Sequence, residues 1–152
     1  MLRCVRLRAP VAHKDYSGVP LWRKLGIGEG ARVRVVGAPK GFPDELGRLA
    51  PVPDGVSFLE RSGAALDVAI VFATRRAELT RRFAELARSL SPAGRLWVAW
   101  PKKAAKIASD LDFDEVQGIG LAAGLVDNKS ASITETFQGL QFVYRVRDRA
   151  RG

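Results

Sequence analysis

The amino-acid sequence predicts a three-layer α/β fold in which a mostly parallel sheet ends in an antiparallel hairpin. Nearly continuous apolar runs, of which residues 66 to 72 are the clearest, are typical of strands that are covered on both faces. An amphipathic helical pattern separates two of these runs, as the connection between parallel strands requires. The last two runs follow each other with no helix between them, which indicates a hairpin.

Glycine and proline mark the ends of the elements in the first half of the chain. Pro20 opens a short helix that ends at Gly26, and the first strand covers residues 32 to 36. Pro43 lies in the first turn of the next helix, where two acidic residues complement the positive end of the helix dipole. Residues 56 to 60 form the second predicted strand.

The middle of the chain alternates between strand and helix patterns. The third strand, residues 66 to 72, precedes the clearest helix, residues 75 to 90, which carries leucine and phenylalanine on one face. Residues 94 to 100 form the fourth strand. A D-x-x-E capping box at residues 112 to 115 then starts a helix that ends at Gly124.

The final elements are a tightly packed helix and two strands. Gly118 and Gly120 inside the last predicted helix indicate close packing against a neighbour. Residues 126 to 134 and 140 to 146 form the two strands, which we expect to be joined near the Gln138-Gly139 dipeptide.

Length and composition point to one domain. The chain has 152 residues and is 47% hydrophobic, which is enough for a single core. We expect a basic segment over residues 1 to 14, an α/β domain over residues 15 to 148, and a basic tail over residues 149 to 152. The single cysteine, Cys4, excludes an internal disulfide and a thiolate metal site, so we predict no bound metal. No apolar run is long enough for a membrane or a signal sequence, so we predict a cytoplasmic protein.

The net charge is +9, and arginine residues at the two ends of the chain contribute much of it. A positive chain associates with polyanions at low salt, but the middle of this sequence is nearly balanced. Charge alone therefore does not predict a nucleic-acid partner.

Six motifs carry a resemblance to a known family. They are Tyr16-Ser17-Gly18-Val19-Pro20-Leu21, Lys24-Leu25-Gly26-Ile27, Gly37-Ala38-Pro39-Lys40-Gly41, Trp97-Val98-Ala99-Trp100-Pro101-Lys102-Lys103-Ala104, Leu121-Ala122-Ala123-Gly124-Leu125-Val126-Asp127 and Gly139-Leu140-Gln141-Phe142-Val143-Tyr144-Arg145. Over about residues 15 to 148 the chain is similar to a small bacterial family of uncharacterised proteins, a domain of unknown function. The resemblance implies a Rossmann-like fold, a shortened form of the class I S-adenosylmethionine-dependent methyltransferase fold, and it implies no catalytic residue.

The loop after the first strand has the position of a nucleotide-binding loop but few of its glycines. Ala38 and Pro39 replace glycines that would bring backbone amides close to a ligand, and proline has no amide proton. The resemblance implies that Gly37, Lys40 and Gly41 would contact an S-adenosylmethionine cofactor, and that Glu60, after the second strand, would bind its ribose. No cofactor is certain from the sequence.

Basic residues follow three of the parallel strands at their carboxyl ends, where ligands bind in open sheets. They are Lys40 after the first strand, Arg75 and Arg76 after the third, and Lys102 and Lys103 after the fourth. Cations at a helix amino terminus cost about 0.3 to 1 kcal/mol each, so this clustering favours an anion-binding cleft, with Trp100 available to stack on a ring. The alternative is that these side chains extend into solvent in weak surface ion pairs.

Three functions stay open at this point. The leading hypothesis is a non-catalytic, methyltransferase-like domain that binds an anionic small molecule or nucleotide at the carboxyl edge of the sheet. The first alternative is a divergent S-adenosylmethionine-dependent methyltransferase, which requires an open groove over Gly41, and no Asn/Asp-Pro-Pro-Tyr-type motif follows the third strand to support it. The second is a scaffold protein that uses the last hairpin or the basic tail on an acidic partner.

Overall fold

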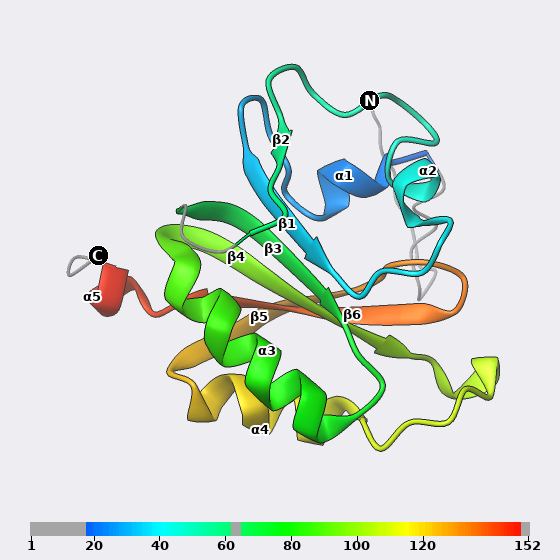
Figure 1. Cartoon of the computed structure of the whole chain (residues 1–152), viewed down its shortest axis with the longest axis vertical. Coiled ribbons are helices and arrows are strands. Elements are labelled where there is room, and N and C mark those ends of the chain that lie inside the picture. The colour runs from blue at the N-terminus through cyan, green and yellow to red at the C-terminus, as the bar shows by residue number, and fades with distance from the viewer. Residues whose placement is uncertain (1–17, 62–64, 150–152) are drawn as a thin grey trace, which may run out of the picture.

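The computed structural model describes residues 18–61 and 65–149, which form one six-stranded sheet with helices on both faces (Figure 1). The strands are β1 (Arg32–Val36), β2 (Ser57–Phe58), β3 (Leu66–Phe72), β4 (Leu90–Pro101), β5 (Leu125–Ser132) and β6 (Phe137–Tyr144). The helices are α1 (Leu21–Lys24), α2 (Phe42–Leu46), α3 (Arg76–Ser89), the 3₁₀ helix η1 (Lys103–Ala105), α4 (Phe113–Ala122) and α5 (Val146–Arg149).

The sheet has the strand order β2-β1-β3-β4-β6-β5. Strand β1 pairs in parallel with both β2 and β3, and β3 pairs in parallel with β4. Strand β6 runs antiparallel to β4 and to β5, so the last two strands form a hairpin added to a parallel sheet. The predicted fold class is confirmed.

Local sequence signals account for the two longest helices. In α3, Leu79, Phe83 and Leu86 recur at helical spacing and are buried, and Glu78 forms an i,i+4 ion pair with Arg82 at 3.3 Å. In α4, the side chain of Asp112 accepts a hydrogen bond of 2.9 Å from the backbone amide of Glu115, so the predicted capping box marks the start of the helix.

Hydrophobic side chains cover both faces of the sheet. On the face below α3 and α4, the rings of Phe83 and Phe142 meet edge to face at 5.1 Å. On the other face, α1 and α2 cover Trp97, whose indole Nε1 donates a 3.0 Å hydrogen bond to the carbonyl of Leu25. Trp97 is fully buried. These faces and the sheet between them make the three layers.

The predicted start of β4 at Gly94 is wrong, because the strand begins at Leu90. Leu90 pairs with Leu66, whereas the next register pair joins Val68 to Arg95, so the intervening residues of β4 bulge out of the ladder. The hydroxyl of Ser91 stabilises the bulge by donating a 2.9 Å hydrogen bond to the Leu66 carbonyl. The sequence pattern did not predict this bulge, because apolar and polar side chains do not alternate regularly among the residues that form it.

The predicted hairpin turn at Gln138-Gly139 is also wrong. The strands are joined at residues 133–136, where the hydroxyl of Thr134 accepts a 3.0 Å hydrogen bond from the amide of Phe137. Gly139 lies within β6, and a Cβ atom at this position would be 2.6 Å from Cδ1 of Ile133. Gly139 is therefore needed for close packing rather than for a turn.

The predicted end of the last strand also differs from the structure. Val146, predicted as part of this strand, begins α5 and is 76% exposed.

Two glycines of α4 offer a matched test of packing. A Cβ atom at Gly120 would overlap the ring of Phe142, whereas one at Gly118 would meet nothing within 4 Å. We expect Gly118→Ala to raise the free energy of unfolding by about 1 kcal/mol through helix propensity. Gly120→Ala should lower it by about 1 to 3 kcal/mol through overpacking. Urea titration of both variants measures the difference, and equal effects would contradict the packing of α4 on β6.

Candidate functional site

The carboxyl ends of β1, β2, β3 and β4 lie along one edge of the sheet, because these four strands are parallel. The ends of these strands and the segments that follow them contain all of the predicted site residues. The structure divides these residues into three groups: the loop after β1 with the end of β2, the start of α3, and the end of β4.

Gly37 holds the loop after β1 tightly against the end of β3. Its φ of +74° is in the left-handed region, and a Cβ atom would be 2.7 Å from the carbonyl oxygen of Phe72. At the other end of the loop, Phe42 turns under the sheet edge, is 2% exposed, and places its ring 4.9 Å from that of Phe72. A Cβ atom at Gly41 would meet nothing within 4 Å, so the space directly beside this residue is open.

Glu60 lies next to this loop at the end of the neighbouring strand. Val33 pairs with Phe58, and the carbonyl of Val33 accepts a 2.7 Å hydrogen bond from the amide of Leu59. Continuing this register brings Glu60 level with Val35, close to the end of β1. The side chain of Glu60 is exposed. The fold thus brings together Glu60 and the predicted cofactor loop on adjacent strands.

The amino terminus of α3 is already occupied by side chains of the chain itself. The backbone amide of Arg76 donates a 2.6 Å hydrogen bond to Asp110, and the guanidinium of Arg76 forms an ion pair with Glu115 at 3.2 Å. The hydroxyl of Ser109 donates a 2.8 Å hydrogen bond to the carbonyl of Thr74, which fixes the same segment over the end of β3. Asp110 therefore takes the place that an anionic ligand would have at this helix start.

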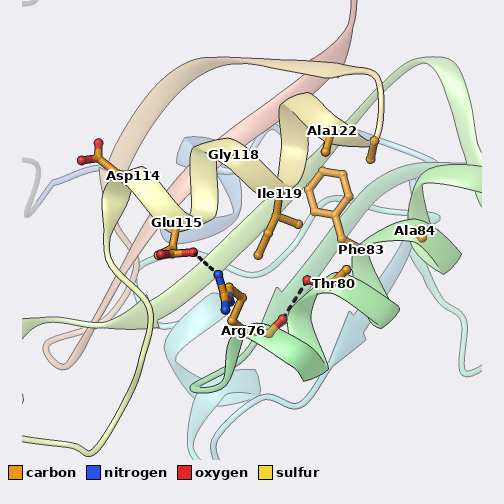
Figure 2. Close-up of a pocket in the computed structure, with 10 residues that line it drawn as sticks. Arg76, Thr80, Phe83, Ala84, Asp114, Glu115, Gly118, Ile119 and Ala122 are labelled. Carbon is orange, nitrogen blue, oxygen red and sulfur yellow. Dashed lines mark hydrogen bonds and ion pairs between the residues drawn. The ribbon is translucent and has the colours of Figure 1, made fainter.

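Figure 2 shows Arg76 and Glu115 pointing toward each other across a groove between α3 and α4. The groove has a volume of about 580 Å³, and Phe83 and Ile119 lie farther along it. Arg76 bridges the two helices through this ion pair. These contacts match the alternative prediction for Arg76, in which its charge is used in a surface ion pair.

The end of β4 forms a separate pocket of about 390 Å³ with the β5-β6 hairpin. Trp100 and Lys102 line it together with Ser132, whose hydroxyl accepts a 2.8 Å hydrogen bond from the Lys102 ammonium. Trp100 is only 3% exposed, so it presents a small part of its indole to the pocket. The predicted pairing of Trp100 with Lys102 is therefore present, but Arg76 is not part of it.

Lys24, which is not among the predicted site residues, lies near Lys102. Partial burial lowers the pKa of Lys24, the Lys102 ammonium lowers it further, and Glu45 acts in the opposite direction. The ammonium of Lys129 also approaches α1, donating a 3.4 Å hydrogen bond to the carbonyl of Lys24. No sequence spacing links these lysines, because α1 and the hairpin meet only through the fold.

The other predicted cations are exposed. Lys40, Arg75 and Lys103 all extend to the surface, and within the described part of the chain none of them forms an ion pair. Residues 18–61 and 65–149 contain no cluster of acidic, histidine and cysteine side chains that could hold a metal ion. In the same ranges no helix has the length and apolarity of a membrane span. The segment 1 to 14 and residues 150–152 of the basic tail lie outside the described residues.

Comparison with solved structures identifies the fold. Magnesium protoporphyrin IX methyltransferase from Synechocystis PCC 6803 with bound S-adenosylhomocysteine (SAH) is similar, with a TM-score of 0.55, 12% identity, and coverage of 82% of this chain and 78% of that one. An S-adenosylmethionine (SAM)-dependent methyltransferase from Aquifex aeolicus gives a TM-score of 0.52 at 18% identity, covering 80% of this chain and 86% of that one. The O-methyltransferase NcsB1, in complex with SAM and 2-hydroxy-5-methyl naphthoic acid, gives a TM-score of 0.60 at 12% identity, covering 82% of this chain and 50% of that one.

The chain therefore has a Rossmann-like, class I methyltransferase-like fold. No family model and no curated protein sequence matches it. The resemblance to a small bacterial family stays a prediction, while the fold that this resemblance implied is confirmed.

Proposed function

We propose that this chain binds S-adenosylmethionine at the carboxyl edge of β1, β2 and β3 and acts as a divergent methyltransferase. The observation that carries the proposal is the placement of Gly37 and Glu60 at the ends of adjacent strands, in a fold shared with proteins crystallised with SAM or SAH. At identities of 12 to 18% the neighbours support the fold, and the local geometry supports the ligand.

The residues present offer contacts for the ribose and for the methionine carboxylate of the cofactor. Gly37 lets the loop after β1 lie directly against the end of β3, and the exposed carboxylate of Glu60 can accept hydrogen bonds from ribose hydroxyls. The exposed ammonium of Lys40 offers a cation to the carboxylate of the methionine end. Pro39 donates no amide proton, so this loop provides fewer backbone donors than a glycine-rich one.

The bound cofactor would supply the electrophilic methyl group, and the chain must orient the acceptor. The segment after β3 has no side chain of the Asn/Asp-Pro-Pro-Tyr type to do this. The pocket at the end of the adjacent strand provides the Lys102 cation for this role, and the largely buried Trp100 forms part of its wall.

A second candidate function is binding of an anionic small molecule without catalysis. The specific observation in its favour is the charge around Lys102, which shares a pocket with Trp100 and lies near the Lys24 ammonium. An anion between these lysines would relieve their mutual repulsion. In this case Lys24 and Lys102 would be the main binding residues, and Glu60 would have no role.

Calorimetric titration with SAM, SAH and ATP separates the two functions. The proposed function predicts saturable micromolar binding of SAM and SAH that changes little between low and moderate salt. The anion-binding function predicts binding of ATP alone, weakening as salt rises and lost in the double variant Lys102→Glu, Lys103→Glu. If neither SAM nor SAH binds, the proposed function is wrong.

A further inference from the structure

A second pocket, on the inner side of the loop after β1, lies between α2 and the edge of the sheet. Its volume is about 360 Å³, and its walls come from β1 (Val35), β2 (Phe58), α2 (Phe42 and Leu46) and the segment after α2 (Val52). Figure 1 shows α2 as a short helix beside the end of β1. Because α2 has only five residues, it leaves part of the β1-β2 surface without a covering helix.

The lining of this pocket is apolar throughout. Among the residues that the structure describes, those that line the pocket are hydrophobic residues, proline or glycine, and none of them has a charged or hydrogen-bonding side chain. Phe58 remains 49% exposed at the edge strand, and Leu49, in the segment after α2, is 46% exposed. Leaving these side chains in water is unfavourable, and a ligand that covered Phe58 would recover about 25 cal/mol for each Å² of apolar surface removed from water.

We propose that this pocket binds an uncharged aromatic small molecule of two or three rings. The volume of about 360 Å³ is large enough for a ligand of this size, and the pocket is open to solvent beside the half-exposed Phe58. Phe42 and Phe58 line the pocket from different elements, and the half-exposed ring of Phe58 can pack on the face or edge of an aromatic ligand.

Charge and polarity restrict the ligand further. A buried carboxylate, phosphate or ammonium without a partner costs several kcal/mol, and this pocket provides no partner for one. The charged methionine end of an S-adenosylmethionine cofactor is excluded for the same reason. The pocket also differs in position from the proposed cofactor site. Ala38 lines the pocket, whereas the cofactor would lie beside Gly41, on the open side of the loop.

Two fluorescent probes with almost the same ring system test the proposal. N-phenyl-1-naphthylamine is uncharged, whereas 8-anilinonaphthalene-1-sulfonate carries a sulfonate that a chain of net charge +9 attracts at its surface. We expect the uncharged probe to show a saturable fluorescence increase with one site per chain and an affinity that does not depend on sodium chloride. Binding of the sulfonate should instead weaken as salt rises.

Variants locate the probe. Val52→Phe fills the pocket and should weaken binding of the uncharged probe at least tenfold. Phe58→Gln removes an exposed wall without disturbing the core, so it should also weaken binding, and it keeps the test valid if Val52→Phe fails to fold. Leu121→Phe, an exposed apolar position on α4, is the matched control and should leave the affinity unchanged.

Two results would overturn the proposal. One is equal affinity in the wild type, Val52→Phe and Phe58→Gln. The other is no saturable binding of the uncharged probe, which would assign the pocket to an apolar side chain of another protein. No adenosyl ligand enters this experiment, so its failure leaves the proposed function unaffected.

Discussion

Replacing Trp97 by alanine is expected to lower the free energy of unfolding by about 3 to 5 kcal/mol. Trp97 is fully buried at the centre of the sheet and packs between β4 and the two short helices α1 and α2. Its indole Nε1 donates a 3.0 Å hydrogen bond to the carbonyl of Leu25, directly after α1, so the substitution also leaves this carbonyl without its donor. The loss should therefore be at the upper end of the range.

Trp22 provides a matched control for this prediction. Its Nε1 donates a similar hydrogen bond, 2.9 Å long, to the carbonyl of Ala50, but the side chain is only half-buried. Urea denaturation followed by circular dichroism should show a smaller loss for Trp22→Ala than for Trp97→Ala, because less apolar surface returns to water. Trp97→Phe should recover part of the packing without the hydrogen bond. Equal losses for the two alanine variants would contradict the central role of Trp97.

The sequence predicted the parts of the fold that depend on local periodicity. Strand β3 was predicted at its observed bounds, because burial on both faces requires an almost continuous apolar run. Helix α3 differs by one residue at each end, since its leucine and phenylalanine spacing marks one face. Gly139 was misinterpreted, because a glycine that permits close packing and a glycine that permits a turn look the same in the sequence.

The sequence located candidate site residues only where their position at the end of a strand determines where they lie in the fold. Gly37 and Glu60 lie at strand ends, which the strand pattern locates, and parallel pairing brings them to one edge. Arg76 was different, because its partners Asp110 and Glu115 are 34 and 39 residues away. A helix start with two arginines looks like a ligand site until tertiary contacts show that an aspartate of the same chain caps it. The same limit applies to Lys24, which meets the hairpin only in the folded chain.

Glu60→Gln is expected to weaken binding of S-adenosylhomocysteine about 10- to 150-fold. In the proposed site the carboxylate accepts hydrogen bonds from ribose hydroxyls, and a hydrogen bond to a charged group contributes about 1.5 to 3 kcal/mol. Glutamine keeps the size of the side chain and one acceptor oxygen but removes the charge. Because Glu60 is exposed and does not belong to the core, the thermal unfolding midpoint should not change.

A control at the other edge of the sheet separates a local effect from a change in net charge. Glu29 is an exposed glutamate in the turn before β1, at the amino ends of the parallel strands, so Glu29→Gln changes the total charge by the same amount. Calorimetric titration should give the wild-type dissociation constant for Glu29→Gln and a weaker one for Glu60→Gln. If SAH binds all three proteins equally, the ribose is not at Glu60 and the cofactor site must lie elsewhere on the edge. If only Glu60→Gln loses affinity, the acid after β2 binds the ribose in this chain, even though its loop after β1 has lost most of its glycines.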